Sequence, residues 1–154
     1  MKRKLKPLEY ALWLLKSRDR SIGEMREKFV KRQYSPEEIE QTLSFLIEKN
    51  FLDDQRFAEN FVRFKKNIKP VGRYYLRNKL MEKKISSDLI DKVLKENTDK
   101  ESEIIAAAKH WMQKNSQLPR EKIYEKLSRH LLSRGFGWEK VREIVDQQIK
   151  KLPN

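Results

Sequence analysis

Residue types that usually carry catalysis are scarce in this chain. It has two histidines, His110 and His130, and no cysteine, which excludes a disulfide framework and every thiolate metal site. Asp53 and Asp54 could pair as magnesium ligands, but an Asp just before a helix and another in its first turn are typical of helix capping. None of the four glycines stands in a phosphate-binding G-x-x-x-x-G-K loop. We therefore expect a protein that is not an enzyme and that needs neither a cofactor nor a metal.

Binding chemistry is concentrated in basic residues. The chain carries a formal charge of +13, and the segments 1–6 and 63–84 together hold +12 of it. A solvated helix face usually mixes both signs, because like charges one helical turn apart repel. Clusters of one sign indicate a surface for a polyanion or an acidic protein. The first segment contributes Lys2, Arg3, Lys4 and Lys6; the second contributes the candidate binding residues Arg63, Lys65, Lys66, Lys69, Arg73, Arg77, Lys79, Lys83 and Lys84.

A helical wheel over residues 73–84 predicts how some of these side chains are arranged. At 100° per residue, Arg73, Arg77 and Lys84 fall within about 40° of one another, beside an apolar stripe on the same helix. Their aliphatic stems can lie along the stripe while the charges point outward. The rings of Tyr74 and Tyr75 suit stacking on bases or on an apolar partner surface, and they suit packing in the core equally well.

Helix signals run along the whole chain and would position these residues. Ser21 with Glu24, and Ser35 with Glu38, are capping boxes. Asn50 can take the left-handed conformation that ends a helix. No alternating apolar stretch of strand length competes with these signals. The predicted helices span 7–18, 21–32, 36–48, 54–68, 73–84, 87–96, 99–114, 120–134 and 138–150.

An internal repeat groups these helices into three triplets. Five apolar positions recur twice with an offset of 51 residues and the same spacing. In each triplet the first two of these apolar positions would form the buried stripe of the middle helix. The third position would fix the turn into the last helix. The positions are Met25, Phe29, Tyr34, Ile39 and Leu43; Leu76, Leu80, Ile85, Ile90 and Leu94; and Leu127, Leu131, Phe136, Val141 and Val145.

The repeat predicts an all-α fold of three tandem three-helix repeats that form an elongated, curved array. Each repeat has about 50 residues, a size at which a single core is marginal unless neighbours stack on it. The expected boundaries are 1–52, 53–97 and 98–154. The first helix of each triplet does not keep the 51-residue register. We expect Trp13, Trp111 and Trp138 to pack in the core or between repeats, and His130 to lie at the surface.

The hydropathy pattern indicates whether the chain carries a membrane segment or a signal peptide. No apolar run approaches the roughly 18–20 residues of a membrane span, and the basic start is not followed by an apolar stretch and cleavage site. We therefore expect neither a signal peptide nor a membrane segment, and a cytoplasmic protein.

Three stretches resemble one known family. Arg18-x-x-Ser21-x-x-Glu24-Met25-x-x-Lys28-Phe29 resembles the opening motif of the RecX family of bacterial recombination regulators. The run L-I-E-K-N-F-L-D-D-Q-R-F-A at residues 46–58 is similar to the central signature of that family. Asn50 stands where the family usually has Gly, and Met25 where it usually has Leu. The third repeat matches by register more than by motif. The third stretch is similar to the glycine, helix and turn of the family's second repeat, and its matching residues are Gly72, Leu76, Leu80, Lys83 and Ile85.

The resemblance implies a regulatory protein that binds the RecA recombinase filament. Such proteins lie in the helical groove of the filament and generally inhibit recombination, strand exchange and ATPase activity in DNA repair and the SOS response. The family has no catalytic residues to carry over. We expect a monomer; whether single- or double-stranded DNA is also contacted stays open, as does the mode of inhibition.

Two other classes of protein compete with this interpretation. A helix-turn-helix transcription factor would also place arginines on the second helix of a tightly turned pair. Three similar units argue against it, because such factors normally carry one reading head and a dimer interface. A purely protein-binding helical scaffold would leave the basic clusters unexplained. Binding to bare duplex, compared with binding to RecA-coated single strands, discriminates between the first two.

Overall fold

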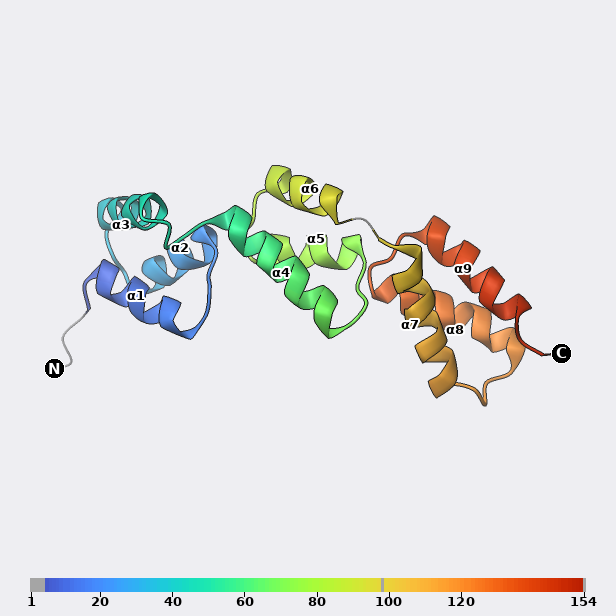
Figure 1. Ribbon diagram of the computed structural model, residues 1–154. Helices are drawn as coiled ribbons and strands as arrows, with labels where there is room; N and C mark the ends of the chain where they lie inside the picture. Colours follow the sequence, from blue (N-terminus) through green and yellow to red (C-terminus); the bar gives the residue numbers. More distant parts are fainter. Residues whose placement is uncertain (1–4, 98, 154) are drawn as a thin grey trace. The chain divides into compact units, whose positions relative to one another are not determined.

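The computed structural model describes residues 5–97 and 99–153, which form nine helices and no strand (Figure 1). The all-α class and the organisation into three-helix repeats are confirmed, and every predicted helix boundary lies within two residues of the observed one. Lys2, Arg3 and Lys4 of the N-terminal basic cluster lie outside the described residues. The helices are α1 (Pro7–Ser17), α2 (Ile22–Lys31), α3 (Pro36–Glu48), α4 (Asp54–Ile68), α5 (Arg73–Glu82), α6 (Ser87–Glu96), α7 (Glu101–Lys114), α8 (Arg120–Ser133) and α9 (Trp138–Lys150).

The predicted caps begin the helices as expected. Ser21 Oγ accepts a hydrogen bond from the Glu24 N–H at 3.0 Å, and the Glu24 carboxylate accepts one from the Ser21 N–H at 3.1 Å. A second capping box opens α3. Asp53 Oδ1 accepts from the Arg56 N–H at 3.0 Å, so Asp53 caps α4. Asn50 has φ 59°, the left-handed conformation predicted at the end of α3.

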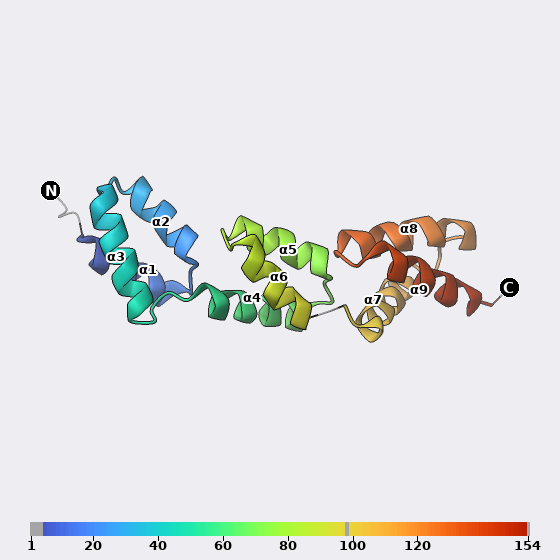
Figure 2. The same ribbon diagram turned by 90° about the horizontal axis from the view of Figure 1, so that it is seen from above.

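The chain divides into two compact units, and the division passes through the second repeat. Unit 1 comprises Met1–Phe61 and Leu80–Ile90; unit 2 comprises Val62–Lys79 and Asp91–Asn154. In unit 1, α3 packs against both α1 and α2 around a core that includes Met25 and Phe29. In unit 2, α7, α8 and α9 pack against one another, as Figures 1 and 2 show from two sides, around a core that includes Leu127 and Phe136.

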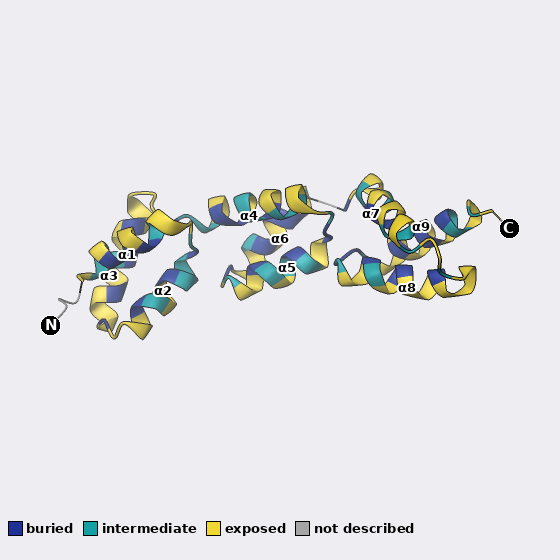
Figure 3. Cartoon of the chain, turned by 90° about the horizontal axis from the view of Figure 1, so that it is seen from below, coloured by how far each residue is buried: buried dark blue, intermediate teal, exposed yellow. Residues whose placement is uncertain are grey.

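The 51-residue register is confirmed by burial. All fifteen apolar positions of the repeat are buried, with exposed fractions between 0 and 7%. Dark buried positions accordingly recur along one side of each helix in Figure 3. The 51-residue repeat therefore predicted correctly which face of the second and third helix in each triplet points into the core.

The first helix of each triplet has a fully buried alanine, but these alanines do not recur at a constant offset. Ala11, Ala58 and Ala108 lie on α1, α4 and α7, and the exposed fraction of each is 0%. They are separated by 47 and then 50 residues, which is why an offset of 51 misses them. A methyl side chain allows another part of the chain to pack closely on the helix backbone at this point.

Several sequence expectations about individual side chains need correction. Trp13 is 61% exposed and Trp138 is 51% exposed, so neither packs in the core, and of the two expected positions only packing between repeats remains for Trp138, which lines a groove with Tyr74 of the second repeat. Trp13 lies on the outer face of α1, stacked on Tyr10 with ring centroids 6.0 Å apart. Trp111 does pack against the core of unit 2, as expected. His130 is half-buried rather than at the surface, with its ring 6.1 Å from that of Trp111.

The start of α7 differs from its prediction by two residues. The helix begins at Glu101 and not at position 99, because the Asp99 side chain bonds to another helix, as described below. Thr98, the residue before the predicted start of this helix, lies outside the described residues. Over the described ranges, no helix combines the length and the apolar character that crossing a bilayer requires.

Candidate functional site

The nine candidate basic residues fall in both units. Lys83 and Lys84 belong to unit 1 and the other seven to unit 2. Arg63 is exposed and Lys65 half-buried on α4, where Lys66 forms an ion pair with Glu103 at 3.5 Å. The helix α5 carries Arg73, Arg77 and Lys79.

Lys83 and Lys84 take part in a junction between repeats inside unit 1. They follow the C-terminal end of α5, and this turn meets the N-terminus of α2, where Ser21 Oγ donates a hydrogen bond to the Lys83 carbonyl oxygen. Lys83 Nζ lies 3.1 Å from Glu24 Oε1, and Lys84 Nζ lies 3.5 Å from Glu27 Oε1. These two cations therefore serve contacts within the protein.

Glu24 is the central acid of this junction. Its side chain is 12% exposed and is paired with both Arg18 and Lys83. Burial opposes the charged form, but hydrogen bonds from Arg18, from the Ser21 N–H and from Lys83 outweigh it and hold the pKa of Glu24 below its ordinary value. Glu24 is consequently an anion that binds two repeats together.

An equivalent junction recurs in unit 2, displaced by 51 residues. The Gly72 N–H, at the position of Ser21, donates to the Arg134 carbonyl at 2.7 Å, and Arg134 is at the position of Lys83. The Tyr74 N–H donates to the Gly135 carbonyl at 3.1 Å. In both junctions the C-terminal turn of one middle helix abuts the N-terminus of another, which places carbonyl groups next to amide groups.

The two junctions make room for this close approach in different ways. In unit 1 the α2 side has Gly23, and a Cβ added there would overlap the Cβ of Lys84. In unit 2 the opposite side has the glycine: Gly135, at φ +85°, lies against the backbone of Tyr75. Lys84 and Gly135 are register equivalents, and both have positive φ. The junction in unit 2 also requires a glycine on the α5 side, because a Cβ added at Gly72 would overlap the Gly135 carbonyl.

The cations of α5 differ in how strongly they are engaged. Arg77 forms an ion pair with Asp91 of α6. The Lys79 ammonium lies 5.9 Å from the centre of the Tyr75 ring. Lys69 and Arg73 form no ion pair with any residue in the part of the chain that the structure describes. The Arg73 guanidinium lies 5.7 Å from the centre of the Tyr74 ring, which is itself 55% exposed.

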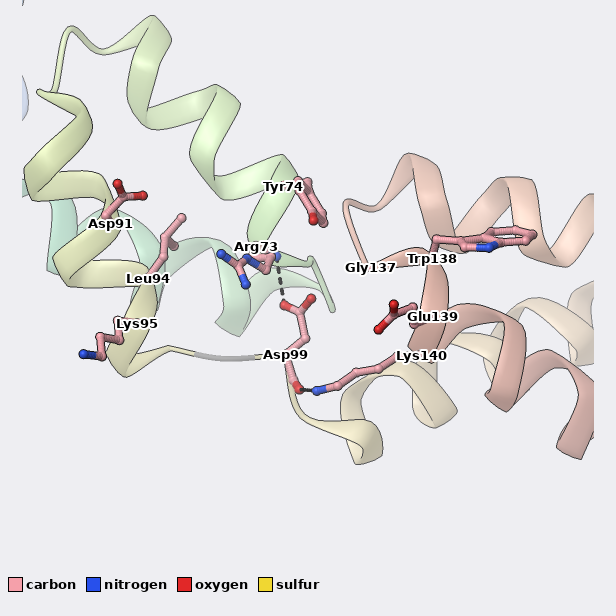
Figure 4. A pocket seen from close by; sticks show the side chains of 10 residues that line it. All are labelled: Arg73, Tyr74, Asp91, Leu94, Lys95, Asp99, Gly137, Trp138, Glu139 and Lys140. Carbon is pink, nitrogen blue, oxygen red and sulfur yellow. Dashed lines mark hydrogen bonds between the residues drawn. The ribbon is translucent and has the colours of Figure 1, made fainter.

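Arg73 and Tyr74 border a groove in unit 2 with a volume of about 770 Å³ (Figure 4). Two half-exposed aromatic rings, Tyr74 and Trp138, stand at its edge, and Asp99 lies between α5 and α9. The Asp99 carboxylate accepts from the Arg73 N–H at 2.8 Å, and Lys140 Nζ donates to the Asp99 carbonyl at 2.7 Å. The groove is lined by Arg73, Tyr74, Asp91, Leu94, Lys95, Asp99, Gly137, Trp138, Glu139 and Lys140.

The chemistry of this region is that of binding. Cations beside exposed aromatic rings can hold phosphates and bases, or the acidic and apolar side chains of a protein. Burial raises the pKa of Asp99, against the lowering effect of the Arg73 N–H and of the charges on Lys66, Lys140 and Arg73. The hydrogen bonds of Asp99 are nevertheless those of a structural cap. No cluster of potential metal ligands occurs among the residues that the structure describes.

Comparison with known proteins identifies the family. Residues 8–46 match the first three-helix domain of RecX, and residues 53–94 match the second. The chain is 36% identical over 146 residues to the regulatory protein RecX of Prosthecochloris aestuarii, a match that covers 94% of each chain. The chain belongs to the RecX family. The resemblance read from its motifs is thereby confirmed.

Other RecX proteins extend the comparison. RecX of Chlorobium phaeobacteroides is 33% identical over 144 residues, covering 92% of this chain and 93% of its own. The crystal structure of RecX from Lactobacillus salivarius superimposes with a TM-score of 0.84 over 96% of both chains, at 21% identity. A second RecX crystal structure has a TM-score of 0.80 over 92% of this chain and 70% of its own, at 22% identity. The RecX fold therefore extends over all three repeats.

Sequence reasoning found the basic cluster of this RecX chain but missed the junction contacts. The available signal was the register itself: Gln33, Lys84 and Gly135 are 51 residues apart, and all three have positive φ. A basic residue precedes each of these positions, at Arg32, Lys83 and Arg134. The binding role of the nine basic residues stays a prediction.

Proposed function

We propose that this protein binds the RecA recombinase filament and inhibits its recombination, strand-exchange and ATPase activities. The observation that carries the proposal is the match to proteins named regulatory protein RecX over 94% of the chain. The chemistry supports a binding protein: the chain has a charge of +13, and the described residues form no metal-ligand cluster. We propose further that it acts in the cytoplasm, as a monomer and without a catalytic step.

The proposed contact surface is the basic segment between residues 63 and 84. Its least engaged cations are Lys69 and Arg73 in unit 2, and the Arg73 guanidinium lies beside the exposed Tyr74 ring. Positive charge next to an exposed ring suits an acidic, partly apolar surface of RecA, and it also suits the DNA within the filament. Four other cations of the segment are paired with acids of the chain, so they contribute less to a partner.

Co-sedimentation with RecA filaments on single-stranded DNA tests the proposal. The test variant replaces four cations of the basic segment: Arg73→Gln, Arg77→Gln, Lys79→Gln and Lys84→Gln. We expect its binding to fall at least tenfold while its helical circular dichroism stays near that of the wild type. The control removes the same charge from exposed positions of the third repeat: Lys109→Gln, Lys114→Gln, Lys122→Gln and Lys150→Gln.

The outcomes separate the candidate functions. Wild-type binding to RecA-coated single strands, with much weaker binding to bare duplex, supports the regulator. Preferential binding to bare duplex would instead support a helix-turn-helix DNA-binding module. Full inhibition of strand exchange by the four-residue variant at wild-type concentrations would exclude the basic segment, and the N-terminal cluster would then be the next surface to test.

A further inference from the structure

The outer face of α1 carries an exposed tryptophan that the fold does not require. Trp13 is 61% exposed and stacks on Tyr10, with the two ring planes 16° apart. The corresponding position, two residues after the buried alanine of the first helix, is Asn60 in the second repeat and His110 in the third. The packing of a first helix therefore does not demand a large apolar ring at this place.

Trp13 is the exposed member of an aromatic cluster in unit 1. The rings of Tyr10, Phe29 and Tyr34 are buried, and their centres lie between 5.7 and 6.4 Å apart. The Arg32 guanidinium, at the end of α2, lies 4.5 Å from the centre of the Tyr10 ring. Trp13 and Arg32 thus both contact Tyr10, which places an exposed indole and a cation on one rigid base of packed rings.

Positive charge converges on this cluster from the start of the chain. The Tyr34 hydroxyl donates a hydrogen bond to the Leu5 carbonyl at 2.7 Å, which holds the first described residue at the cluster. The residues Lys-Arg-Lys at 2–4 directly precede Leu5 in the sequence, and Lys6 follows it. Neither Lys6 nor Arg32 forms an ion pair with any residue that the structure describes.

Two acids, Glu9 and Glu38, also lie near the Tyr34 hydroxyl, and both are engaged in caps. The Glu9 carboxylate accepts a hydrogen bond from the Lys6 N–H at 2.9 Å, and the Glu38 carboxylate accepts one from the Ser35 N–H at 2.8 Å. A carboxylate at a helix N-terminus is stabilised by the helix itself. The cations at 2–4, at Lys6 and at Arg32 outnumber these two acids, so the surface around Trp13 attracts anions.

We propose that this first-repeat cluster, made of Trp13, Tyr10, Arg32, Lys6 and residues 2–4, binds single-stranded DNA. A base stacks on the exposed Trp13 ring, and the adjoining phosphates bind Arg32 and the cations before α1. Aromatic rings beside cations are the usual means by which proteins hold single strands without reading their sequence. The inference goes beyond the proposed function, because this contact needs no RecA.

The composition of the cluster favours a single strand over other occupants. Every nucleotide of a single strand supplies a planar base and a charged phosphate, so an indole flanked by cations fits any register of the strand. A duplex keeps its bases stacked on one another and would offer Trp13 little beyond its backbone. An acidic protein segment would need one particular pairing of an apolar and an acidic side chain.

Fluorescence anisotropy with a labelled oligothymidine, in the absence of RecA, tests the stacking contact. Trp13→Ala should bind about tenfold more weakly, as expected when one stacked base is lost. Trp13→Phe keeps a ring and should recover most of the affinity. The control Tyr124→Ala removes an exposed ring from the third repeat and should bind as the wild type does. Equal affinities of wild type and Trp13→Ala would overturn the inference.

Intrinsic fluorescence reports the stack directly. A base that stacks on an indole quenches its emission, so the emission of the wild type should fall when oligothymidine binds. The emission of Trp13→Phe, which comes from Trp111 and Trp138 alone, should stay constant. An equal loss of emission in both proteins would exclude Trp13 as the stacking residue.

The salt dependence tests the phosphate contacts. Lys6→Gln with Arg32→Gln should lower the magnitude of the slope of log binding constant against log salt concentration by about 0.7 for each phosphate contact that is lost. Lys109→Gln with Lys122→Gln removes the same charge from exposed positions of the third repeat and should leave the slope unchanged. Equal slopes in the two variants would overturn the assignment of phosphates to Lys6 and Arg32.

The outcomes also distinguish this inference from the proposed function. A wild-type protein that binds RecA filaments but not bare oligothymidine overturns the inference and leaves the proposed function in place. Binding to oligothymidine without binding to filaments has the opposite meaning. If Trp13→Ala binds filaments more weakly but binds bare oligothymidine as the wild type does, the occupant of the cluster is a protein surface and the inference is wrong.

Discussion

The carboxylate of Asp54 accepts a hydrogen bond at 2.8 Å from the backbone N–H of Ile22, the first residue of α2. The Asp99 carboxylate accepts one at the same distance from the N–H of Arg73, the first residue of α5. The two N–H groups are 51 residues apart and the two acids 45. Each acid stands at the beginning of the next repeat, so a helix N-terminus is capped by a residue from the following repeat. The first turn of a middle helix in one repeat is therefore stabilised by an acid at the start of the next repeat.

The first prediction concerns the pH dependence of the cap at Asp99. Burial raises the pKa of this carboxyl above its ordinary value of 3.8, so the folded state holds the proton more tightly than the unfolded state does. Its contribution to stability is then greatest below pH 3.8 and falls as the pH rises through the folded-state pKa. Asp99→Asn keeps an acceptor oxygen but cannot ionise.

Melting temperatures of the wild type and of Asp99→Asn between pH 3.5 and 7 check this prediction. Relative to the wild type, the variant should gain stability as the pH rises. Asp99→Ala, which loses the cap as well, should be less stable than Asp99→Asn throughout. A constant difference between wild type and Asp99→Asn across this range would show that Asp99 does not titrate with a raised pKa.

The second prediction concerns packing at the junction in unit 1. A Cβ at position 23 would overlap the Cβ of Lys84, so Gly23→Ala should destabilise the protein by about 1–3 kcal/mol, the usual cost of overpacking. Lys84→Gly removes the opposing Cβ at a residue with positive φ, where glycine is favoured. The double variant should recover most of the stability of the wild type.

Chemical denaturation of the wild type, both single variants and the double variant gives the coupling between the two positions. We expect a coupling free energy of about 0.5–3 kcal/mol, as for residues in contact. Additive effects would mean that positions 23 and 84 do not meet in the folded protein.

The third prediction separates a cap from a functional acid. Asp53 caps α4 through the Arg56 N–H, so Asp53→Ala should cost about 1 kcal/mol of stability. Filament binding should be unchanged wherever the protein remains folded. Loss of binding at an unchanged melting temperature would assign Asp53 to the partner surface.

Local signals in the sequence predicted most of the fold. Capping boxes such as Ser21 with Glu24 depend on a few adjacent residues, and the apolar register depends only on spacing, so both can be read without coordinates. Asp54 and Asp99 show where such reading stops. Each looks like part of its own helix start, yet bonds to a helix that begins 32 or 26 residues earlier. That choice depends on how consecutive repeats stack, which no local pattern encodes.

The candidate site was predicted less fully for the same reason. The charge count placed Lys83 and Arg73 in one cluster, because both lie in a segment of one sign. Their partners differ: Glu24 pairs with Lys83 from 59 residues away, while the Arg73 guanidinium forms no ion pair among the described residues and lies beside the Tyr74 ring. Net charge over a segment cannot distinguish a cation that holds the fold from one that is available to a partner.

The last prediction divides the basic segment by this distinction. Two variants remove the same charge: Lys69→Gln with Arg73→Gln, and Lys83→Gln with Lys84→Gln. The second variant lacks the ion pairs with Glu24 and Glu27 and should be less stable by about 1 kcal/mol, as expected for partly exposed ion pairs, with filament binding largely retained. The first variant breaks no ion pair, so its melting temperature should match that of the wild type while its binding weakens. If Lys69 and Arg73 bind phosphates, the binding constant of the first variant should also depend less steeply on salt. On single-stranded DNA, the magnitude of the slope of log binding constant against log salt concentration should fall by about 0.7 for each phosphate contact that is lost. Equal reductions of binding in the two variants would mean that total charge, and not the position of Lys69 and Arg73, determines recognition.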